Sequence, residues 1–295
     1  MASPTFNPHH GHNPPPPSGP VTAPLNFFNP PADGSPPFNH VDTPPAHLPQ
    51  RNFTDTPHPV PLTDIRGSES AFTLDHDAFA AVTVLPSPDS TPVDFTSESS
   101  ILQSYYPTVE SLLLTHIPGS TRVILFDHTI RRTSPSAPRA PVQRVHIDQT
   151  AQSALQRVRR HLPADEADAL LRGRYRIVNV WRPLNKNPVE SFPLAFASSA
   201  TLQDEDVVPV EHRYNSGYTG QTAAIKYNAG QKWYYWSGMT ENERILLECF
   251  DSEAAKEGSV VKGGRVAHTA FEDPRTRADA EGRESIEVRA LVFGP

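Results

Sequence analysis

The segment Ser285-Ile286-Glu287-Val288-Arg289-Ala290-Leu291-Val292-Phe293, close to the C-terminus, is the stretch that decides the predicted fold class. Its apolar residues first alternate with charged ones, and this period of two is typical of a β-strand with one buried face. Residues 174–181 alternate in the same way, with Asn179 and Trp181 on one face and Val178 and Val180 on the other. Both segments therefore predict β-strands.

Working outward from these two segments, the rest of the chain gives many short strand signals and few helix signals. Further strands are predicted at residues 122–126, 143–148, 207–214, 222–227, 232–236 and 266–270, and residues 71–85 suggest short strands or the edge of a helix. Helices are predicted at 107–116, at 151–161, and from a capping box at Thr240 and Glu243 to about Leu247. Because strands do not alternate with helices, we predict a mainly β fold, an antiparallel sandwich or jelly roll with flanking helices outside it.

The N-terminal quarter of the chain has a different composition. Eighteen of the 33 prolines lie in the first 61 positions. Proline lacks a backbone N–H, so residues 1–65 are predicted to be a disordered or extended arm that forms neither a helix nor a central strand. Residues 66–295 are predicted to form a single domain, long enough to bury a sizeable core.

Composition also excludes several classes of protein. A net charge of −7 argues against a nucleic-acid-binding protein, which would present a basic face. The single cysteine, Cys249, excludes a disulfide framework. The chain contains neither a glycine-rich phosphate loop nor a Gly-x-Ser-x-Gly elbow. It has no secretory signal and no apolar run of membrane-spanning length, so we expect a soluble, cytoplasmic protein with no membrane partner.

Candidate metal ligands lie on two of the predicted strands. His146 and Asp148 are two positions apart, so their side chains share one face of a strand. His268 lies on another short strand, entered from Gly263-Gly264. The His-x-Asp pair alone is also explained as a hydrogen-bonded pair at a strand edge. Together with His268, it supplies the two histidines and one carboxylate that can hold iron(II) with three positions left open.

The segment after His268 contains residues suited to bind a 2-oxo acid that chelates such a metal. The distal carboxylate of the acid would pair with a permanently charged, planar arginine, and a hydroxyl two residues later would share its face. Arg283 and Ser285 meet this description. Arg289 lies on the same face as Arg283, so periodicity leaves both arginines open as the carboxylate partner. Arg283 is favoured because Ser285 follows it.

The order His-x-Asp, His and Arg-x-Ser resembles the iron(II)- and 2-oxoglutarate-dependent oxygenases. The chain is most similar to the gibberellin-desaturase-like and cephamycin-methoxylase-like branch of secondary-metabolite hydroxylases and desaturases. The matching stretches run from about residue 105 to the C-terminus: residues 126–132, 144–149, 179–184, 225–228, 233–235, 249–252, 268–269 and 283–289.

This resemblance implies a double-stranded β-helix, the cupin-like jelly roll. It implies iron(II) and 2-oxoglutarate as cofactors, with O₂ as co-substrate. It further implies oxidation of an unactivated C–H bond of a small metabolite, by hydroxylation, desaturation or oxidative cyclisation. Two alternatives stay open at this point: a cupin-type metal enzyme that does not use 2-oxoglutarate, and a non-catalytic jelly-roll binding protein.

Four further residues are candidates for contact with the substrate: Arg182, Asn179, Tyr227 and His128. Arg182 could bind a substrate carboxylate or cap a turn, and Asn179 could serve the site or the core. His128 is also an outside candidate for a metal ligand. Because of Arg182 and other nearby arginines, we expect the substrate to be an amino or carboxylic acid.

Overall fold

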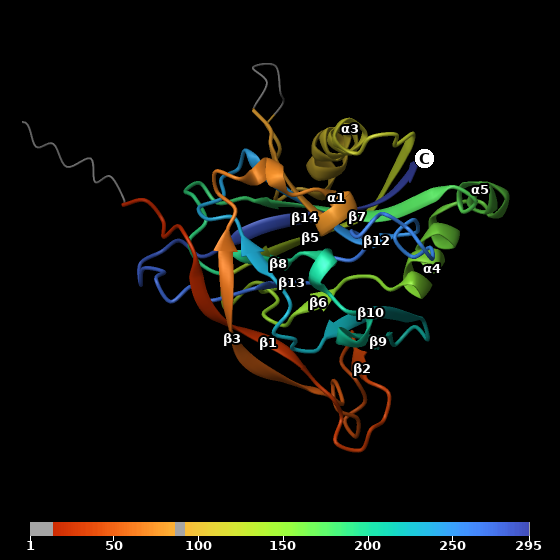
Figure 1. Ribbon diagram of the computed structural model, residues 1–295, viewed down its shortest axis with the longest axis horizontal. Coiled ribbons are helices and arrows are strands. Elements are labelled where there is room, and N and C mark those ends of the chain that lie inside the picture. The colour runs from red at the N-terminus through yellow and green to blue at the C-terminus, as the bar shows by residue number, and fades with distance from the viewer. Residues whose placement is uncertain (1–13, 86–91, 295) are drawn as a thin grey trace, which may run out of the picture.

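The computed structural model describes residues 14–85 and 92–294, and within them the chain forms two β-sheets (Figure 1). The strands are β1 (Val21–Asn29), β2 (Phe38–His40), β3 (Thr54–Asp64), β4 (Phe79–Thr83), β5 (Arg122–Arg132), β6 (His146–Ile147), β7 (Arg174–Pro183), β8 (Leu194–Ala197), β9 (Val207–Arg213), β10 (Thr219–Ile225), β11 (Trp233–Tyr235), β12 (Glu243–Asp251), β13 (His268–Ala270) and β14 (Glu284–Gly294). The α-helices are α1 (Leu74–Asp77), α2 (Glu98–Ser100), α3 (Tyr106–His116), α4 (Ala151–His161) and α5 (Ala164–Leu170), with a π-helical turn at Ile101–Tyr105 and 3₁₀ turns at Glu69–Ala71, Ser199–Thr201 and Asp204–Asp206.

The smaller sheet has five strands in the order β4-β12-β7-β14-β5. β14 lies between β7 and β5, and Glu287 is directly opposite both Trp181 and Thr129. On the outer face of β14, Ile286 and Val288 are fully buried in a core shared with the π-helical turn and α3. The two strands that alternation predicted therefore pair with each other, and Glu287 and Arg289 of β14 lie on the same face as Asn179 and Trp181 of β7.

The larger sheet has nine strands in the order β1-β3-β11-β8-β13-β6-β10-β9-β2. Its strands β13 and β6 are neighbours, with His268 paired to His146. One face of these strands looks toward the smaller sheet. On the other face, Val145, Ile147 and Ala267 are buried in a core that also contains Leu25 and Leu62 from the N-terminal strands.

The N-terminal segment, whose first 13 residues lie outside the described part of the chain, contributes three strands to the larger sheet. The prediction that it cannot form a central strand is wrong, because β3 lies between β1 and β11 in the sheet order. However, β11 pairs only with Leu62, Thr63 and Asp64, and residues 54–61 pair with β1 alone. Pro57, Pro59 and Pro61 of β3 occupy every second position, so their missing N–H groups all fall on one side of the strand. Val60 and Leu62 alternate with them and are buried.

The other helix and strand predictions have mixed outcomes. Helices α3 and α4 confirm the two longer helix predictions. The short helix predicted from Thr240 is wrong. The Glu243 carboxylate does accept a hydrogen bond from the Thr240 backbone N–H at 2.8 Å, but strand β12 follows. All nine residues of β12 are buried between β4 and β7, so ladder hydrogen bonds on both sides outweigh the local cap. Helix α5 and strand β8 were not predicted.

The mainly β architecture with helices outside the sheets is confirmed. In Figure 1, α3 lies over the smaller sheet, while α4 and α5 lie beside the ends of β7 and β10. No helix in the described ranges is long and apolar enough to cross a membrane.

The packing of β3 makes a testable prediction about the N-terminal segment. Leu62 is 1 % exposed. Truncating it with Leu62→Ala leaves a cavity behind the β6 and β13 strands and should lower the free energy of unfolding by about 2–5 kcal/mol. The neighbouring Thr63→Ala, on the exposed face, should change it by no more than about 0.5 kcal/mol. Urea denaturation followed by circular dichroism measures the free energy of unfolding of both variants. Equal stability of the two would contradict the packing of β3 into the core.

Candidate metal and co-substrate site

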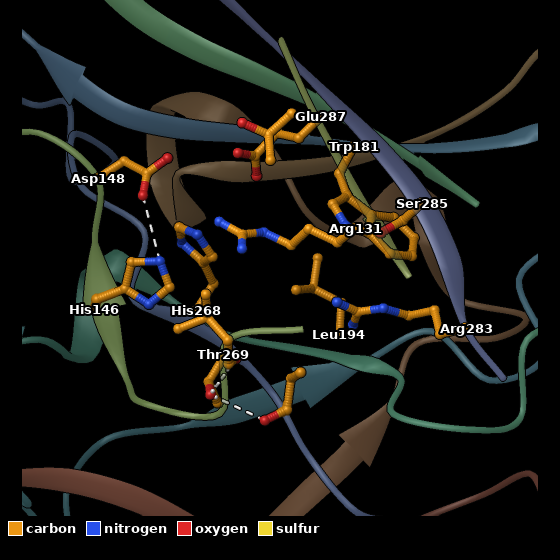
Figure 2. Close-up of a pocket in the computed structure, with 13 residues that line it drawn as sticks. Arg131, His146, Asp148, Trp181, Leu194, His268, Thr269, Arg283, Ser285 and Glu287 are labelled. Carbon is orange, nitrogen blue, oxygen red and sulfur yellow. Dashed lines mark hydrogen bonds and ion pairs between the residues drawn. The ribbon is translucent and has the colours of Figure 1, made fainter. Parts of the chain in front are cut away.

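A cavity lies between the inner faces of the two sheets (Figure 2). The residues that line it come from both sheets and from the segments beside them: Thr129, Arg131, Val142, His146, Asp148, Trp181, Leu194, His268, Thr269, Ala270, Arg283, Ser285 and Glu287. Five of the residues singled out from the sequence are therefore brought together, namely His146, Asp148, His268, Arg283 and Ser285.

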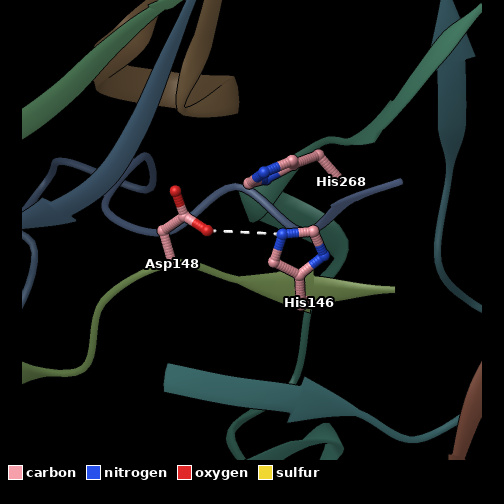
Figure 3. A group of neighbouring side chains, drawn as sticks. All are labelled: His146, Asp148 and His268. Carbon is pink, nitrogen blue, oxygen red and sulfur yellow. Dashed lines mark ion pairs between the residues drawn. The ribbon is translucent and has the colours of Figure 1, made fainter. Parts of the chain in front are cut away.

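His146, Asp148 and His268 form a compact group at one end of the cavity (Figure 3). The two histidines are cross-strand neighbours on β6 and β13, and their ring centroids are 4.4 Å apart. His146 Nε2 lies 3.3 Å from Asp148 Oδ1. One ligand atom from each of the three residues lies within 4.8 Å of the other two. This is the only such group of three or more histidine, cysteine or acidic side chains among the described residues.

Backbone carbonyls fix the orientation of both imidazole rings. The Nδ1 atom of His146 lies 2.8 Å from the carbonyl oxygen of Arg144, and that of His268 lies 3.2 Å from the carbonyl oxygen of Val266. A carbonyl oxygen only accepts hydrogen bonds, so each Nδ1 carries the proton and each Nε2 keeps its lone pair. Burial, together with the neighbouring His146, lowers the pKa of His268 to about 4 and so favours the neutral ring.

Asp148 is held as a carboxylate by its neighbours. Burial alone would raise its pKa, but Arg289 and the two histidines hold the pKa of Asp148 well below its ordinary value. Its Oδ2 accepts hydrogen bonds from Asn179 Nδ2 at 2.9 Å and from Arg289 Nε at 3.1 Å. Oδ1 is the oxygen nearer to His146, so one carboxylate oxygen is fixed by the protein while the other faces the histidines.

Arg289 makes ion pairs on every side. Besides Asp148, its guanidinium donates to Asp127 Oδ1 at 3.1 Å and to Glu287 Oε1 at 2.5 Å. It also donates to Thr129 Oγ1 at 3.1 Å. Arg289 is not among the residues that line the cavity, and it joins three carboxylates, Asp127, Asp148 and Glu287.

Arg283 has a different environment. It is 2 % exposed, and no carboxylate in the described part of the chain lies within ion-pair distance of it. One terminal nitrogen donates to the carbonyl oxygen of Phe192 at 2.6 Å, and its Nε has no hydrogen-bond partner. Burial and the nearby Arg131 lower the pKa of Arg283 to about 9. A buried cation without a counter-ion is costly, so this end of the cavity is suited to an anion.

Three of the four residues proposed to contact substrate do not reach the cavity. Arg182 follows Trp181 on β7, so it points to the opposite face, over the rings of Phe95 and Tyr105. Side chains of adjacent strand residues alternate, which is the physical reason for this placement.

His128 and Tyr227 also lie away from the triad. His128 is on the outer face of β5, where it contacts the Tyr106 hydroxyl at 3.1 Å and Glu98 at 3.3 Å. Tyr227 is 42 % exposed and stacks on His58 with ring centroids 4.0 Å apart. Asn179 alone of the four candidates touches the site, through its hydrogen bond to Asp148.

Sequence reasoning missed four polar residues that line the cavity: Thr129, Arg131, Thr269 and Glu287. The strand predicted at residues 122–126 in fact continues as β5 to Arg132. Extending the alternation by six residues would have placed Thr129 and Arg131 on one face. Glu287 lies two residues from both Ser285 and Arg289, so its place on that face follows from the same period.

Comparisons with known proteins agree with this arrangement. Residues 25–293 match a family model described as "Oxidoreductase/YMDC permease-like domain". The chain is 39 % identical over 306 aligned positions to the hydroxylase/desaturase poxK of Penicillium oxalicum, covering 95 % of this chain and 93 % of that protein. It is 32 % identical to the Fe(II)/2-oxoglutarate-dependent dioxygenase nvfI of Aspergillus novofumigatus, over 85 % of this chain and 89 % of that protein.

A solved structure of the iron and alpha-ketoglutarate-dependent endoperoxidase NvfI superposes on this chain with a TM-score of 0.84 and 31 % sequence identity. The superposition covers 94 % of this chain and 98 % of that one. The jelly-roll prediction is thereby confirmed, and the relatives favour the oxygenase over a cupin-type enzyme without 2-oxoglutarate and over a non-catalytic binding protein. The chain belongs to the iron(II)- and 2-oxoglutarate-dependent oxygenases, as the order of its histidine, aspartate and arginine residues predicts.

Proposed function

We propose that His146, Asp148 and His268 bind the iron(II) of this oxygenase, and that Arg283 and Ser285 bind the distal carboxylate of 2-oxoglutarate. One observation carries the proposal. A triad of metal-ligating atoms and a buried arginine without a counter-ion line the same cavity (Figure 2). A ligand with a metal-chelating end and an anionic end would complement both.

The residues present fit an iron(II) ion. Two neutral imidazoles and one carboxylate are the donor set of the facial triad, which leaves open positions for a chelating co-substrate and O₂. Burial favours the neutral ring of His268, and the pKa of Asp148 is held well below its ordinary value, so both are in the protonation states that bind a metal.

The same holds for 2-oxoglutarate. The planar guanidinium of Arg283 can bind a carboxylate through two parallel hydrogen bonds, and such a bond would satisfy its unpartnered Nε. Ser285, 1 % exposed, lies two positions along the same face. Arg289 is the weaker candidate, because turning it toward a co-substrate would remove the hydrogen bond that holds Asp148.

Iron(II), 2-oxoglutarate and O₂ together supply the oxidation of a substrate C–H bond, with 2-oxoglutarate converted to succinate and CO₂. The chain's own residues bind these groups and orient the side chains that hold them. Arg289 and Asn179 hold one oxygen of Asp148, and the carbonyls of Arg144 and Val266 hold the two rings. Trp181 and Leu194 form an apolar wall that limits the access of water to the cavity.

The substrate is a small molecule, and we propose that the reaction is a hydroxylation or desaturation in secondary metabolism. The hydroxylase/desaturase poxK of Penicillium oxalicum, to which the chain is similar, supports this reaction type. The amino or carboxylic acid substrate stays a prediction. Arg182, which motivated it, lies on the outer face of β7. Succinate release measured across amino acids and neutral terpenoids or polyketides tests it, and stimulation by the neutral compounds alone would contradict it.

The metal assignment predicts the behaviour of a triad variant. Anaerobic addition of Fe(II) and then 2-oxoglutarate to the intact protein should produce the weak visible charge-transfer band of the chelate. His268→Ala removes one of three ligands and should abolish the band. His128→Ala, on the outer face of the neighbouring sheet, is the matched control and should retain it. An undiminished band in His268→Ala would rule out this ligand set.

The co-substrate assignment predicts a selective loss of affinity. Arg283→Gln should weaken 2-oxoglutarate binding about tenfold or more, because a charge-assisted bidentate contact is lost. Binding of 2-oxovalerate, which has no distal carboxylate, should change little. Anaerobic titration of the charge-transfer band measures both constants. The assignment fails if Arg283→Gln binds 2-oxoglutarate as tightly as the intact protein does.

Arg289 is predicted to support Fe(II) binding through its effect on Asp148. Arg289→Gln removes the cation that keeps the pKa of Asp148 low, so Fe(II) affinity should fall about 10–100-fold. The loss should grow as the pH falls, because Asp148 becomes protonated at a higher pH than in the intact protein and then competes poorly for the metal. Equilibrium Fe(II) titrations at several pH values measure this. A loss independent of pH would contradict the electrostatic role.

A further inference from the structure

A second arginine, Arg131, enters the same cavity and has no role in the function proposed so far. It lies on β5 directly opposite Ser285 of β14. Figure 2 shows its side chain extending from that position toward His268, whereas the side chain of Arg283 extends beside Leu194. The two guanidinium groups therefore reach different parts of the cavity, one nearer the triad and one farther from it.

Arg131 has no anionic partner. Its guanidinium donates one hydrogen bond, to the carbonyl oxygen of Ala140 at 3.0 Å, and no carboxylate in the described ranges lies within ion-pair distance of it. The next residue, Arg132, points to the other face and pairs with Glu284 at 2.9 Å. Burial lowers the pKa of Arg131. Arg132, on the outer face of β5, is therefore paired with a carboxylate. Its neighbour Arg131, on the inner face, is not.

The ion pairs of the site show that two of its arginines lack an anion. The site has three arginines, Arg131, Arg283 and Arg289. The three carboxylates beside them, Asp127, Asp148 and Glu287, are all hydrogen-bonded to Arg289. Two buried cations are left without an anion. A single monoanion would compensate one of them, whereas a dianion with a carboxylate at each end would compensate both.

We propose that Arg131 binds the carboxylate of 2-oxoglutarate that adjoins its 2-oxo group, while Arg283 binds the distal one. This inference rests on the proposed function, because it takes the triad as the metal site. Arg131 is the arginine that points toward His268, so it lies at the metal end of the cavity. Arg283 and Ser285 then bind the far end.

The two arginines consequently affect the affinity for different sets of 2-oxo acids. Every 2-oxo acid has the carboxylate beside the 2-oxo group, so Arg131 strengthens the binding of all of them. Only a dicarboxylic acid has the distal group, so Arg283 discriminates 2-oxoglutarate from 2-oxovalerate. Removal of Arg131 should weaken the binding of both 2-oxoglutarate and 2-oxovalerate. Removal of Arg283 should weaken the binding of 2-oxoglutarate only.

The experiment compares Arg131→Gln with Arg132→Gln, its neighbour on the outer face, and with Arg283→Gln. Each full-length protein is loaded anaerobically with Fe(II) and titrated with 2-oxoglutarate and with 2-oxovalerate, by the charge-transfer band and by calorimetry. Arg131→Gln should weaken both ligands about tenfold and leave their affinity ratio and the Fe(II) affinity unchanged. Arg132→Gln should bind as the intact protein does.

Other outcomes overturn the proposal. If Arg131→Gln loses affinity for 2-oxoglutarate alone, Arg131 binds the distal carboxylate. If it binds both acids normally, Arg131 serves the substrate or the fold. A loss of Fe(II) affinity in the same variant shows a structural role. Should Arg131→Gln not fold, Arg131→Lys is the second variant. It keeps the positive charge but not the planar guanidinium, and it must weaken the binding of both acids by equal factors. If the intact protein gives no band with 2-oxoglutarate, the proposed function itself fails.

Discussion

The pairing of His146 with His268 across two adjacent strands is the contact on which the rest of the site depends. A cross-strand pair places two side chains on the same face at a short distance, and the backbone ladder fixes that distance. The same backbone also supplies the carbonyl groups that orient both rings. Asp148 joins this pair because it lies two positions from His146, so β6, the residue after it and β13 provide the three side chains that we propose as metal ligands.

The smaller sheet provides the charges that complete the cavity. Along β14 and the residue before it, Arg283, Ser285, Glu287 and Arg289 repeat with a period of two and share the inner face. Polar residues at such positions would be unfavourable in an ordinary sandwich core. They persist here because Arg289 is satisfied by carboxylates, and because Arg283 faces a cavity in which we propose an anion binds.

The N-terminal strands support this arrangement from behind. Leu25 of β1 and Leu62 of β3 share a buried core with Val145 and Ile147, the residues on either side of His146. The residues on either side of His146, a proposed metal ligand, are thereby fixed in a dry core, which limits the motion of its side chain. Prolines at alternate positions of β3 keep the strand extended without removing the hydrogen bonds on its paired side.

The sequence by itself determined the faces of the strands and the chemistry of the site. Alternation placed Asn179 with Trp181, and spacing placed His146 with Asp148 and Arg283 with Ser285, because a strand repeats every two residues. Spacing within one strand cannot show which other strand lies opposite. Periodicity therefore did not distinguish Arg283 from Arg289, and only the following Ser285 favoured Arg283. The strand through Arg131 was predicted too short.

Only the tertiary structure decided those points. It brought His268 beside His146, surrounded Arg289 with carboxylates while leaving Arg283 and Arg131 without them, and turned Arg182 to the outer face. It also made the proline-rich segment part of the larger sheet, because burial of Val60 and Leu62 outweighs the donors that proline lacks. Pairing between distant strands sets these outcomes, and it depends on contacts that no local pattern contains.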